Sequence, residues 1–399
     1  MHTDLLIIGG GPAALSAATG YRDAGGPGSV LLVSEEDTAP YLRPPLSKEY
    51  LRGETEQHEL ALQHPGLYTE LAIDSRLDTR VSELDAQGRR AKLGGGEWVH
   101  YGSCVLATGA VPRPLPVPGA DDPAVAYLRS LHSARQLRES AEGASSAVVI
   151  GSGFIGCEAA VSLARRGVRV NVLSAEPLPQ HGRLGAALGR RIAGWLAEED
   201  VRFIGDATVT AIERGHRVHL GDSLQQGEQP VLEADLVLVA AGVTPRCELA
   251  ARAGARIHQQ RVVVDDRMRT DQPGLLAAGD VAYAHNAAAG RHLVVEHWGE
   301  ALAMGTIAGT TAAGGDTRWA RAPGFWSMIG EHTLKYVAWG DGYQQTRLVD
   351  HGGGAFTVWY STEGVTVGVA THQADNDYER GRHLVEQAKP PPDQDRSAG

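Results

Sequence analysis

The sequence predicts an α/β fold with two Rossmann-like dinucleotide-binding domains and a C-terminal α+β domain. Three observations in its 399 residues carry this prediction. A strand, a glycine-rich turn and a helix pattern follow one another from Asp4, and the same succession returns from Ala147. Beyond Ala322, aromatic and valine-rich segments of strand length predominate, and a closing helix pattern runs from Asp377 to Gln387. The length allows two or three domains, each with a core of its own.

The first glycine-rich turn follows an apolar run, Leu5 to Ile8, and opens an alanine-rich helix pattern. Gly9, Gly11 and Ala14 match the G-x-G-x-x-G/A pattern of dinucleotide-binding turns. The first small residue permits the tight turn, the second lets the backbone approach a pyrophosphate, and the third lets the helix pack on the strand. The N-terminal N–H groups of that helix would hold the phosphate. Glu35 follows the next predicted strand, about where an acid that binds an adenosine ribose belongs. A glycine turn in an ordinary α/β protein would not need an acid at this position.

The second turn repeats the pattern with Gly151, Gly153 and Gly156, and a helix pattern and another strand follow it. Glu176 lies near the position of the ribose acid, although Ser174 is closer to its usual place. One chain thus carries two complete βαβ units. This indicates two nucleotides, one that is retained and one that is exchanged.

Composition and charge narrow the classes of function. The net charge of −11 speaks against nonspecific binding to nucleic acid, and no apolar run reaches the roughly 20 residues of a membrane span. Cys104, Cys157 and Cys247 are too far apart in sequence to suggest a disulfide framework, so a cytoplasmic location is predicted. The histidines lack metal-ligand spacing, so no metal site is predicted.

The segment YLRPPLSK follows the first glycine-rich turn and its two predicted strands. Its two prolines stiffen the loop, and it contains two cationic side chains, Arg43 and Lys48. These side chains could face a phosphate or a cofactor. A surface loop with two solvated cations explains the composition equally well.

Together these stretches resemble the FAD-dependent ferredoxin reductases of bacterial oxygenase and monooxygenase systems, relatives of the apoptosis-inducing-factor-like oxidoreductases. The matching segments lie in family order between residues 4 and 330: GGGPAA, YLRPPLSK, LATGA, GSGFIGCEAA, AAGVTPR, AAGDVA, VEHWGEA and FWSMIG. The resemblance implies a discontinuous FAD domain (1–113 and 247–320) with an NADH domain (114–246) inserted in it. A C-terminal α+β domain (321–389) would follow. The proline-rich, polar composition of residues 390–399 predicts a disordered tail.

The resemblance also implies the residues of the site. Glu35 would bind the adenosine ribose of FAD, Asp280 its ribityl chain, and Gly242 would lie where the nicotinamide passes. The full set implied in cofactor binding is Gly9, Gly11, Pro12, Ala13, Ala14, Glu35, Arg43, Lys48, Thr108, Gly109, Arg113, Gly151, Gly153, Phe154, Ile155, Gly156, Glu158, Glu176, Gly242, Gly279, Asp280, Glu296, His297 and Trp298.

Three of these residues are implied in the chemistry. Lys48 and Glu158 would meet beside the flavin N5 region, where charge changes on reduction. Trp298 would lie against the flavin ring. The alternatives are a plain structural ion pair for Lys48 and Glu158, and a core aromatic role for Trp298.

The expected activity follows from what the sequence has and lacks. It has no C-x-x-C motif and no cysteine in the RPPLSK segment, so electrons would leave from the flavin itself rather than through thiols. Together with this absence, the resemblance implies an enzyme that oxidises NADH, less readily NADPH, and reduces an iron–sulfur ferredoxin, as a monomer or homodimer. The alternatives are an apoptosis-inducing-factor-like oxidoreductase that uses a quinone or dioxygen, and a redox-sensing protein that binds FAD and NADH.

Overall fold

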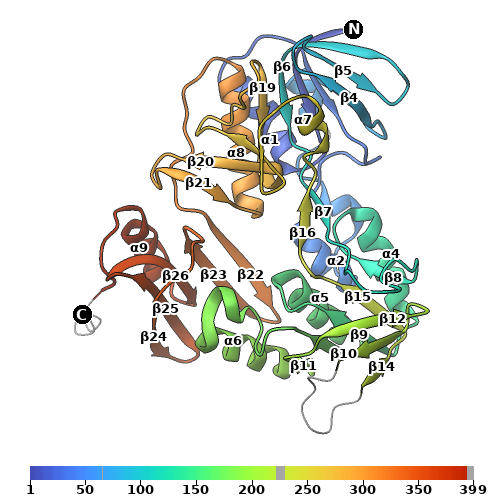
Figure 1. The fold of residues 1–399 in the computed structure, drawn as a ribbon, viewed down its shortest axis with the longest axis vertical. Coiled ribbons are helices and arrows are strands. Elements are labelled where there is room, and N and C mark those ends of the chain that lie inside the picture. Colours follow the sequence, from blue (N-terminus) through green and yellow to red (C-terminus); the bar gives the residue numbers. More distant parts are fainter. Residues whose placement is uncertain (65, 222–229, 393–399) are drawn as a thin grey trace.

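The computed structural model describes residues 1–64, 66–221 and 230–392. It confirms the predicted fold class: two mainly parallel sheets lie in the two nucleotide-binding parts, and an antiparallel sheet forms the C-terminal part (Figure 1). The tail that was expected to be disordered falls largely on residues 393–399, which lie outside the described residues.

The first sheet has the order β3-β2-β1-β6-β5-β4, and β19 pairs with the end of β6, from Cys104 to Leu106, beyond the part of β6 that pairs with β5. Both neighbours of β1 run parallel to it, and its apolar run is buried on both faces, as is usual for the centre of a parallel sheet. The strands are β1 (His2–Ile8), β2 (Val30–Val33), β3 (Ile73–Arg76), β4 (Val81–Asp85), β5 (Arg90–Leu93), β6 (Trp98–Leu106) and β19 (Leu275–Ala277). The segment between β2 and β3 holds only short helices: η1 (Pro44–Ser47), α2 (Glu49–Arg52), η2 (Gln57–Leu60) and α3 (Leu67–Glu70).

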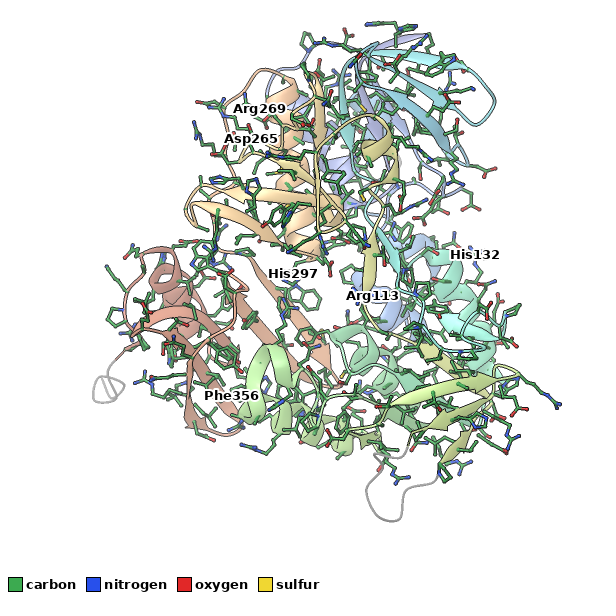
Figure 2. All side chains as sticks on the ribbon, viewed as in Figure 1. Arg113, His132, Asp265, Arg269, His297 and Phe356 are labelled. Atoms are coloured by element: carbon green, nitrogen blue, oxygen red, sulfur yellow. The ribbon has the colours of Figure 1, made fainter. Side chains whose placement is uncertain are left out.

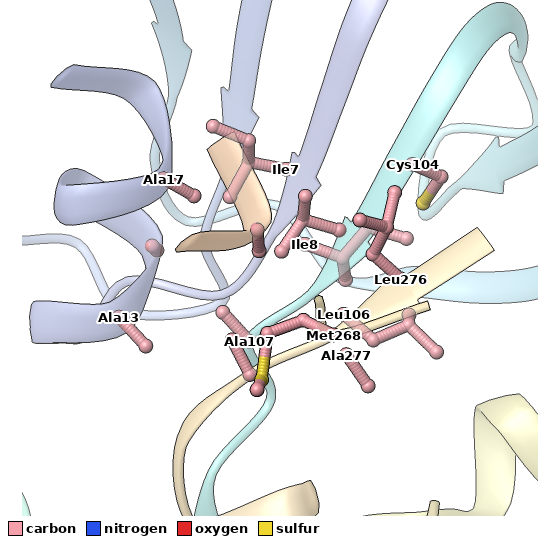
Figure 3. Close-up of a cluster of buried hydrophobic side chains, with 14 of the residues drawn as sticks. Ile7, Ile8, Ala13, Ala17, Cys104, Leu106, Ala107, Met268, Leu276 and Ala277 are labelled. Atoms are coloured by element: carbon pink, nitrogen blue, oxygen red, sulfur yellow. The ribbon is translucent and has the colours of Figure 1, made fainter. Parts of the chain in front are cut away.

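Two helices, α1 (Pro12–Asp23) and α8 (Trp298–Ala312), pack closely although they are distant in sequence. A Cβ on Gly309 would lie 2.0 Å from the carbonyl oxygen of Ala17, and one on Gly305 would lie 2.3 Å from that of Ala13. Small residues are therefore required where the two backbones meet. Figure 3 shows Ala13 and Ala17 beside the buried side chains of β1, β6 and β19 in this core.

The second parallel sheet has the order β11-β10-β9-β15-β8. Its strands are β8 (Val125–Tyr127), β9 (Ser146–Ile150), β10 (Arg169–Leu173), β11 (Arg202–Ile204) and β15 (Leu236–Val239). Its helices are α4 (Leu131–Glu142), α5 (Phe154–Arg165) and α6 (His181–Glu198). A small antiparallel sheet beside it consists of β12 (Val209–Glu213), β13 (Arg217–Leu220) and β14 (Val231–Glu233).

A two-stranded ribbon joins the two nucleotide-binding parts. It pairs β7 (Ala110–Pro112) with β16 (Val243–Pro245), so the chain leaves and returns side by side (Figure 1). After the ribbon come α7 (Glu248–Arg252), η3 (Gly279–Val281) and a four-stranded sheet of β17 (Ile257–His258), β18 (Arg261–Val264), β20 (Ala282–Asn286) and β21 (Arg291–Val294). The domain limits given above stay a prediction.

The C-terminal part is a five-stranded antiparallel sheet in the order β22-β23-β26-β25-β24 with one helix on it. Its elements are β22 (Gly324–Ile329), β23 (His332–Ala338), β24 (Gln345–Gly352), β25 (Ala355–Thr362), β26 (Val365–His372) and α9 (Asp375–Glu386). It is anchored to the second nucleotide-binding part, where the Tyr360 hydroxyl donates to the Leu184 carbonyl in α6 at 2.9 Å.

Candidate functional site

One cavity of about 1730 Å³ is lined by both glycine-rich turns, the ribbon and the start of the C-terminal sheet. Ordinary small-molecule sites occupy roughly 300–1,000 Å³, so this cavity is large enough for more than one such ligand. It lies at the carboxyl ends of β1 and β9, where ligands bind in open α/β sheets. The position of the cavity therefore agrees with the two turns predicted from the sequence.

The first turn combines a position that only glycine can occupy with one that leaves space. Gly9 has φ +141°, and a Cβ there would lie 2.1 Å from the Ala107 carbonyl oxygen. At Gly11, by contrast, the nearest atoms to an added Cβ belong to the Arg43 guanidinium, 4.0 Å away. The backbone of Gly11 is thus open to the cavity, as close approach of a pyrophosphate requires.

Three carboxylates around this turn line the cavity, and each is paired with an arginine. The pairs are Glu35 with Arg246, Glu36 with Arg43 at 2.7 Å, and Asp280 with Arg129 at 2.6 Å. The hydrogen bond from Arg246 lowers the pKa of Glu35 below its usual value. Arg43, which was expected to face a cofactor, therefore also fixes Glu36.

Two of these arginines were missed from the sequence. Arg246 follows β16, and its partner Glu35 lies 211 positions earlier. Arg129 follows β8 and also donates from Nε to the Ala110 carbonyl at 3.1 Å. The segment AAGVTPR was the available signal for Arg246, whereas no motif marks Arg129.

The second turn repeats the construction of the first. Gly151 has φ +113°, and a Cβ there would lie 2.4 Å from the Ala240 carbonyl oxygen. A Cβ on Gly153 would meet nothing nearer than Gln180 Nε2, at 3.7 Å. The second turn is therefore also open where a phosphate would approach.

Glu176 lies differently from what was expected of a ribose acid. Its carboxylate accepts the backbone N–H of Gly182 at 3.1 Å, at the start of α6. Among the described residues that line the cavity, Glu176 does not appear. Its role toward NADH stays a prediction.

Lys48 and Glu158 meet where the two nucleotide-binding parts come together. Lys48 Nζ lies 3.1 Å from Glu158 Oε2, and both side chains are buried. Ser47 Oγ donates to the same oxygen at 2.5 Å, and Ser327 Oγ donates to Oε1 at 2.7 Å. The contact implied by the resemblance is present, and the carboxylate is held by hydrogen bonds from three side chains.

His297 lies beside Arg183, which the sequence suggested only as a possible partner for a nucleotide phosphate. Its Nε2 is 3.3 Å from Arg183 Nη2, and its ring centroid is 4.5 Å from that of Phe325. Burial, and after it the Arg183 charge, lowers the pKa of His297 to about 3, so the ring is neutral and accepts a hydrogen bond from Arg183. Figure 2 labels His297 near the centre of the molecule, where the three parts meet.

Aromatic rings close the space between the second turn and the C-terminal sheet. Phe154, at the start of α5, lies edge-on to Phe325 with ring centroids 4.8 Å apart. Trp326, next on β22, is 49% exposed, and the centroid of its ring lies 5.4 Å from Lys48 Nζ. Trp298, the first residue of α8, lines the same cavity.

Most of the predicted site residues surround this one cavity. Those that do not line it are Ala14, Arg113, Gly151, Gly156 and Glu176. Ala14 is fully buried, and a Cβ on Gly156 would lie 2.1 Å from the Gly151 carbonyl oxygen, so both act in close packing. Arg113 instead donates to the Val243 carbonyl at 3.4 Å within the ribbon.

The cysteines do not belong to this site. Cys104 and Cys157 are buried, burial raises the pKa of both thiols, and none of the three free cysteines lines the cavity. Among the described residues, no three histidine, cysteine, aspartate or glutamate side chains are grouped as metal ligands would be. No helix in that part of the chain is long and apolar enough to cross a membrane.

Comparison with known proteins agrees with this geometry. Residues 3–305 match the model of the pyridine nucleotide-disulphide oxidoreductase family. The chain is 34% identical over 332 residues to the rubredoxin-NAD(+) reductase of Pseudomonas putida, which covers 83% of this chain and 85% of the relative.

Solved structures give the same result. A ferredoxin reductase from Rhodopseudomonas palustris matches with a TM-score of 0.90 and 29% identity, over 97% of this chain and 96% of that one. The crystal structure of the covalent putidaredoxin reductase–putidaredoxin complex matches with a TM-score of 0.89 and 28% identity, over 97% and 94%. These likenesses confirm the resemblance to ferredoxin reductases, and the chain belongs to the pyridine nucleotide-disulphide oxidoreductase family.

Proposed function

We propose that this protein is an FAD-dependent oxidoreductase that takes hydride from NADH and passes electrons singly to an iron–sulfur protein of the ferredoxin type. Such an acceptor would serve an oxygenase or monooxygenase. The observation that carries the proposal is one continuous cavity that joins two dinucleotide turns, has the Lys48–Glu158 pair between them and has no cysteine on its described lining. The names of its relatives, rubredoxin-NAD(+) reductase and putidaredoxin reductase, support it.

FAD fits the first turn and its carboxylates. The open backbone at Gly11 would hold the pyrophosphate, Glu35 the adenosine ribose, and Asp280 the ribityl hydroxyls. NADH would lie against the second turn, with Gly153 at its pyrophosphate and Gly242 near the nicotinamide.

Bound FAD would supply the redox chemistry, because it accepts a hydride and returns the electrons one at a time. Lys48 would provide a fixed positive charge beside it, since Glu158, Ser47 and Ser327 hold that end of the site in place. Phe154 and Phe325 narrow the space between the turn and the C-terminal sheet and would exclude water from it. His297, which stays neutral, would add no charge of its own.

The route out of the site would pass the C-terminal part. Trp326 is exposed at the cavity beside Lys48, and it offers an apolar surface to a docked partner. The overall charge of −11 means that an acidic ferredoxin would need a local basic patch. The three free cysteines support the predicted reducing, cytoplasmic location.

Cytochrome c reduction by NADH, measured with and without each member of a ferredoxin panel, tests the proposal. We expect at least one ferredoxin to raise the rate, and we expect that rate to fall as salt rises because the surfaces attract over a distance. If no ferredoxin raises it while a quinone or dioxygen turns over quickly, the acceptor is a small molecule and the proposal fails.

A further inference from the structure

The two dinucleotide units correspond residue by residue at the end of their second strand. Gly9 N donates to the Val33 carbonyl at 2.9 Å, and Gly151 N donates to the Leu173 carbonyl at 2.8 Å. Each bond ties the first glycine of a turn to the last residue of the next strand. The residues that follow Val33 and Leu173 can therefore be compared directly.

The same serine turn follows both strands. Ser34 Oγ accepts the backbone N–H of Glu36 at 3.1 Å, and Ser174 Oγ accepts that of Glu176 at 3.1 Å. Glu36 thus corresponds to Glu176. The residue between serine and glutamate is exposed to the cavity in the first unit, where it is Glu35.

Ala175 stands in the second unit where Glu35 stands in the first. It is exposed and carries no hydrogen-bonding side chain. The preceding Ser174 is 5% exposed, and its hydroxyl is engaged by Ser152 Oγ at 2.8 Å. The position that holds a ribose acid in the first unit is therefore filled by a methyl group in the second.

The neighbouring acids do not replace it. The Glu176 carboxylate turns to the Gly182 N–H. Asp206, at the end of the next strand, and Glu176 are both absent from the described residues that line the cavity. The side chain closest to Gly153 is the neutral Gln180.

We propose that this enzyme discriminates only weakly between NADH and NADPH, because Ala175 leaves the second unit without a ribose-binding carboxylate. In this fold such a carboxylate accepts from the ribose hydroxyls of NADH and repels the 2′-phosphate of NADPH. Without this carboxylate, the kcat/KM values for NADH and NADPH differ by less than about tenfold. About tenfold is the lower limit of the discrimination that a single contact contributes. The inference rests on the proposed function.

The test restores the acid by the substitution Ala175→Glu and compares it with Ala197→Glu. Ala197 is an exposed alanine at the far end of α6, so the control adds the same side chain and charge to the same part of the chain. Two quantities are measured for each protein with bound FAD. They are the anaerobic rate of flavin reduction by NADH and by NADPH, and the Kd of NAD⁺ and of NADP⁺ by calorimetry.

We expect the wild type and Ala197→Glu to show NADP⁺/NAD⁺ Kd ratios below about tenfold, and Ala175→Glu to raise that ratio by about tenfold or more. A wild-type preference above about a hundredfold overturns the inference, as does an Ala175→Glu ratio equal to that of the control. If neither nucleotide reduces the flavin, the proposed function fails, but the Kd ratios still test the inference about selectivity. If neither nucleotide binds, the proposed function and this inference are both overturned.

Discussion

The two glycine-rich turns share a backbone and differ in the charges around them. Beside the first, three carboxylates face the cavity, and each carries an arginine partner. Among the described lining residues that the second unit contributes between Gly153 and Val243, Glu158 and Arg183 are charged and the others are neutral. A turn surrounded by fixed charges suits a cofactor that is held throughout the cycle. A turn with few charges suits a nucleotide that must leave after each reaction.

The largest expected effect that tests this difference between the turns comes from replacing the open glycine of each turn by valine. Both positions have room for a side chain within the protein, since an added Cβ would lie 4.0 Å from its nearest neighbour at Gly11 and 3.7 Å at Gly153. Gly11→Val should fold without FAD, because the side chain fills the pyrophosphate space. Gly153→Val should keep FAD and lose about a hundredfold in the rate of flavin reduction by NADH.

Flavin absorbance per mole of protein and stopped-flow reduction measure these two effects, and circular dichroism checks the fold of each variant. Stoichiometric FAD in Gly11→Val would show that the first turn is not the FAD site. Loss of FAD from Gly153→Val would remove the distinction between the turns.

The ion pair between the turns offers the next largest effect. Lys48→Met leaves the Glu158 carboxylate buried without its cation, so we expect the free energy of unfolding to fall by about 3–5 kcal/mol. We also expect flavin reduction to slow by about ten- to a hundredfold, because the positive charge that we propose lies beside the flavin is lost.

The double variant Lys48→Met/Glu158→Gln separates the two roles of the pair. It removes both charges, so it should recover most of the stability while the reduction rate stays low. Recovery of the rate together with the stability would assign the pair a structural role alone.

A smaller effect concerns His297, which lies between the first unit and Arg183. Its pKa is lowered to about 3, below the value of about 6.5 in an unfolded chain. The unfolded state therefore binds the proton first as pH falls, and stability present above pH 6.5 is lost between about pH 6.5 and 3. Between pH 7.5 and 5 the free energy of unfolding should fall by about 1–2 kcal/mol less in His297→Gln than in the wild type, as measured by urea denaturation. Equal pH dependence in both proteins would show that His297 titrates normally.

The parts of the site that are contiguous in sequence could be predicted from it. Gly9, Gly11, Gly151 and Gly153 each act through the backbone of a local turn, and the structure gives each of them the predicted geometry. The Lys48–Glu158 contact spans 110 positions and was available only through family resemblance.

The parts that depend on the meeting of distant segments could not be predicted. Arg129 and Arg183 come from the second nucleotide-binding part and reach Asp280 and His297, which belong to the other side of the cavity. No local pattern states which cation meets which carboxylate, because tertiary packing decides it. The register of Glu176 was uncertain for a local reason, because more than one residue after the strand could present an acid. The hydrogen bond from the Glu176 N–H to Ser174 Oγ matches Glu176 to Glu36 of the first unit rather than to Glu35.

The central claim is that NADH reduces the flavin directly and that no thiol takes part. Anaerobic titration of the FAD-loaded protein with NADH, with thiols counted in denaturant before and after, tests this most directly. We predict that the flavin is fully reduced by about one equivalent of NADH and that the three cysteines titrate as free thiols at both points. Uptake of a second equivalent, together with the appearance of two new thiols, would place a cysteine pair in the electron path and contradict the claim.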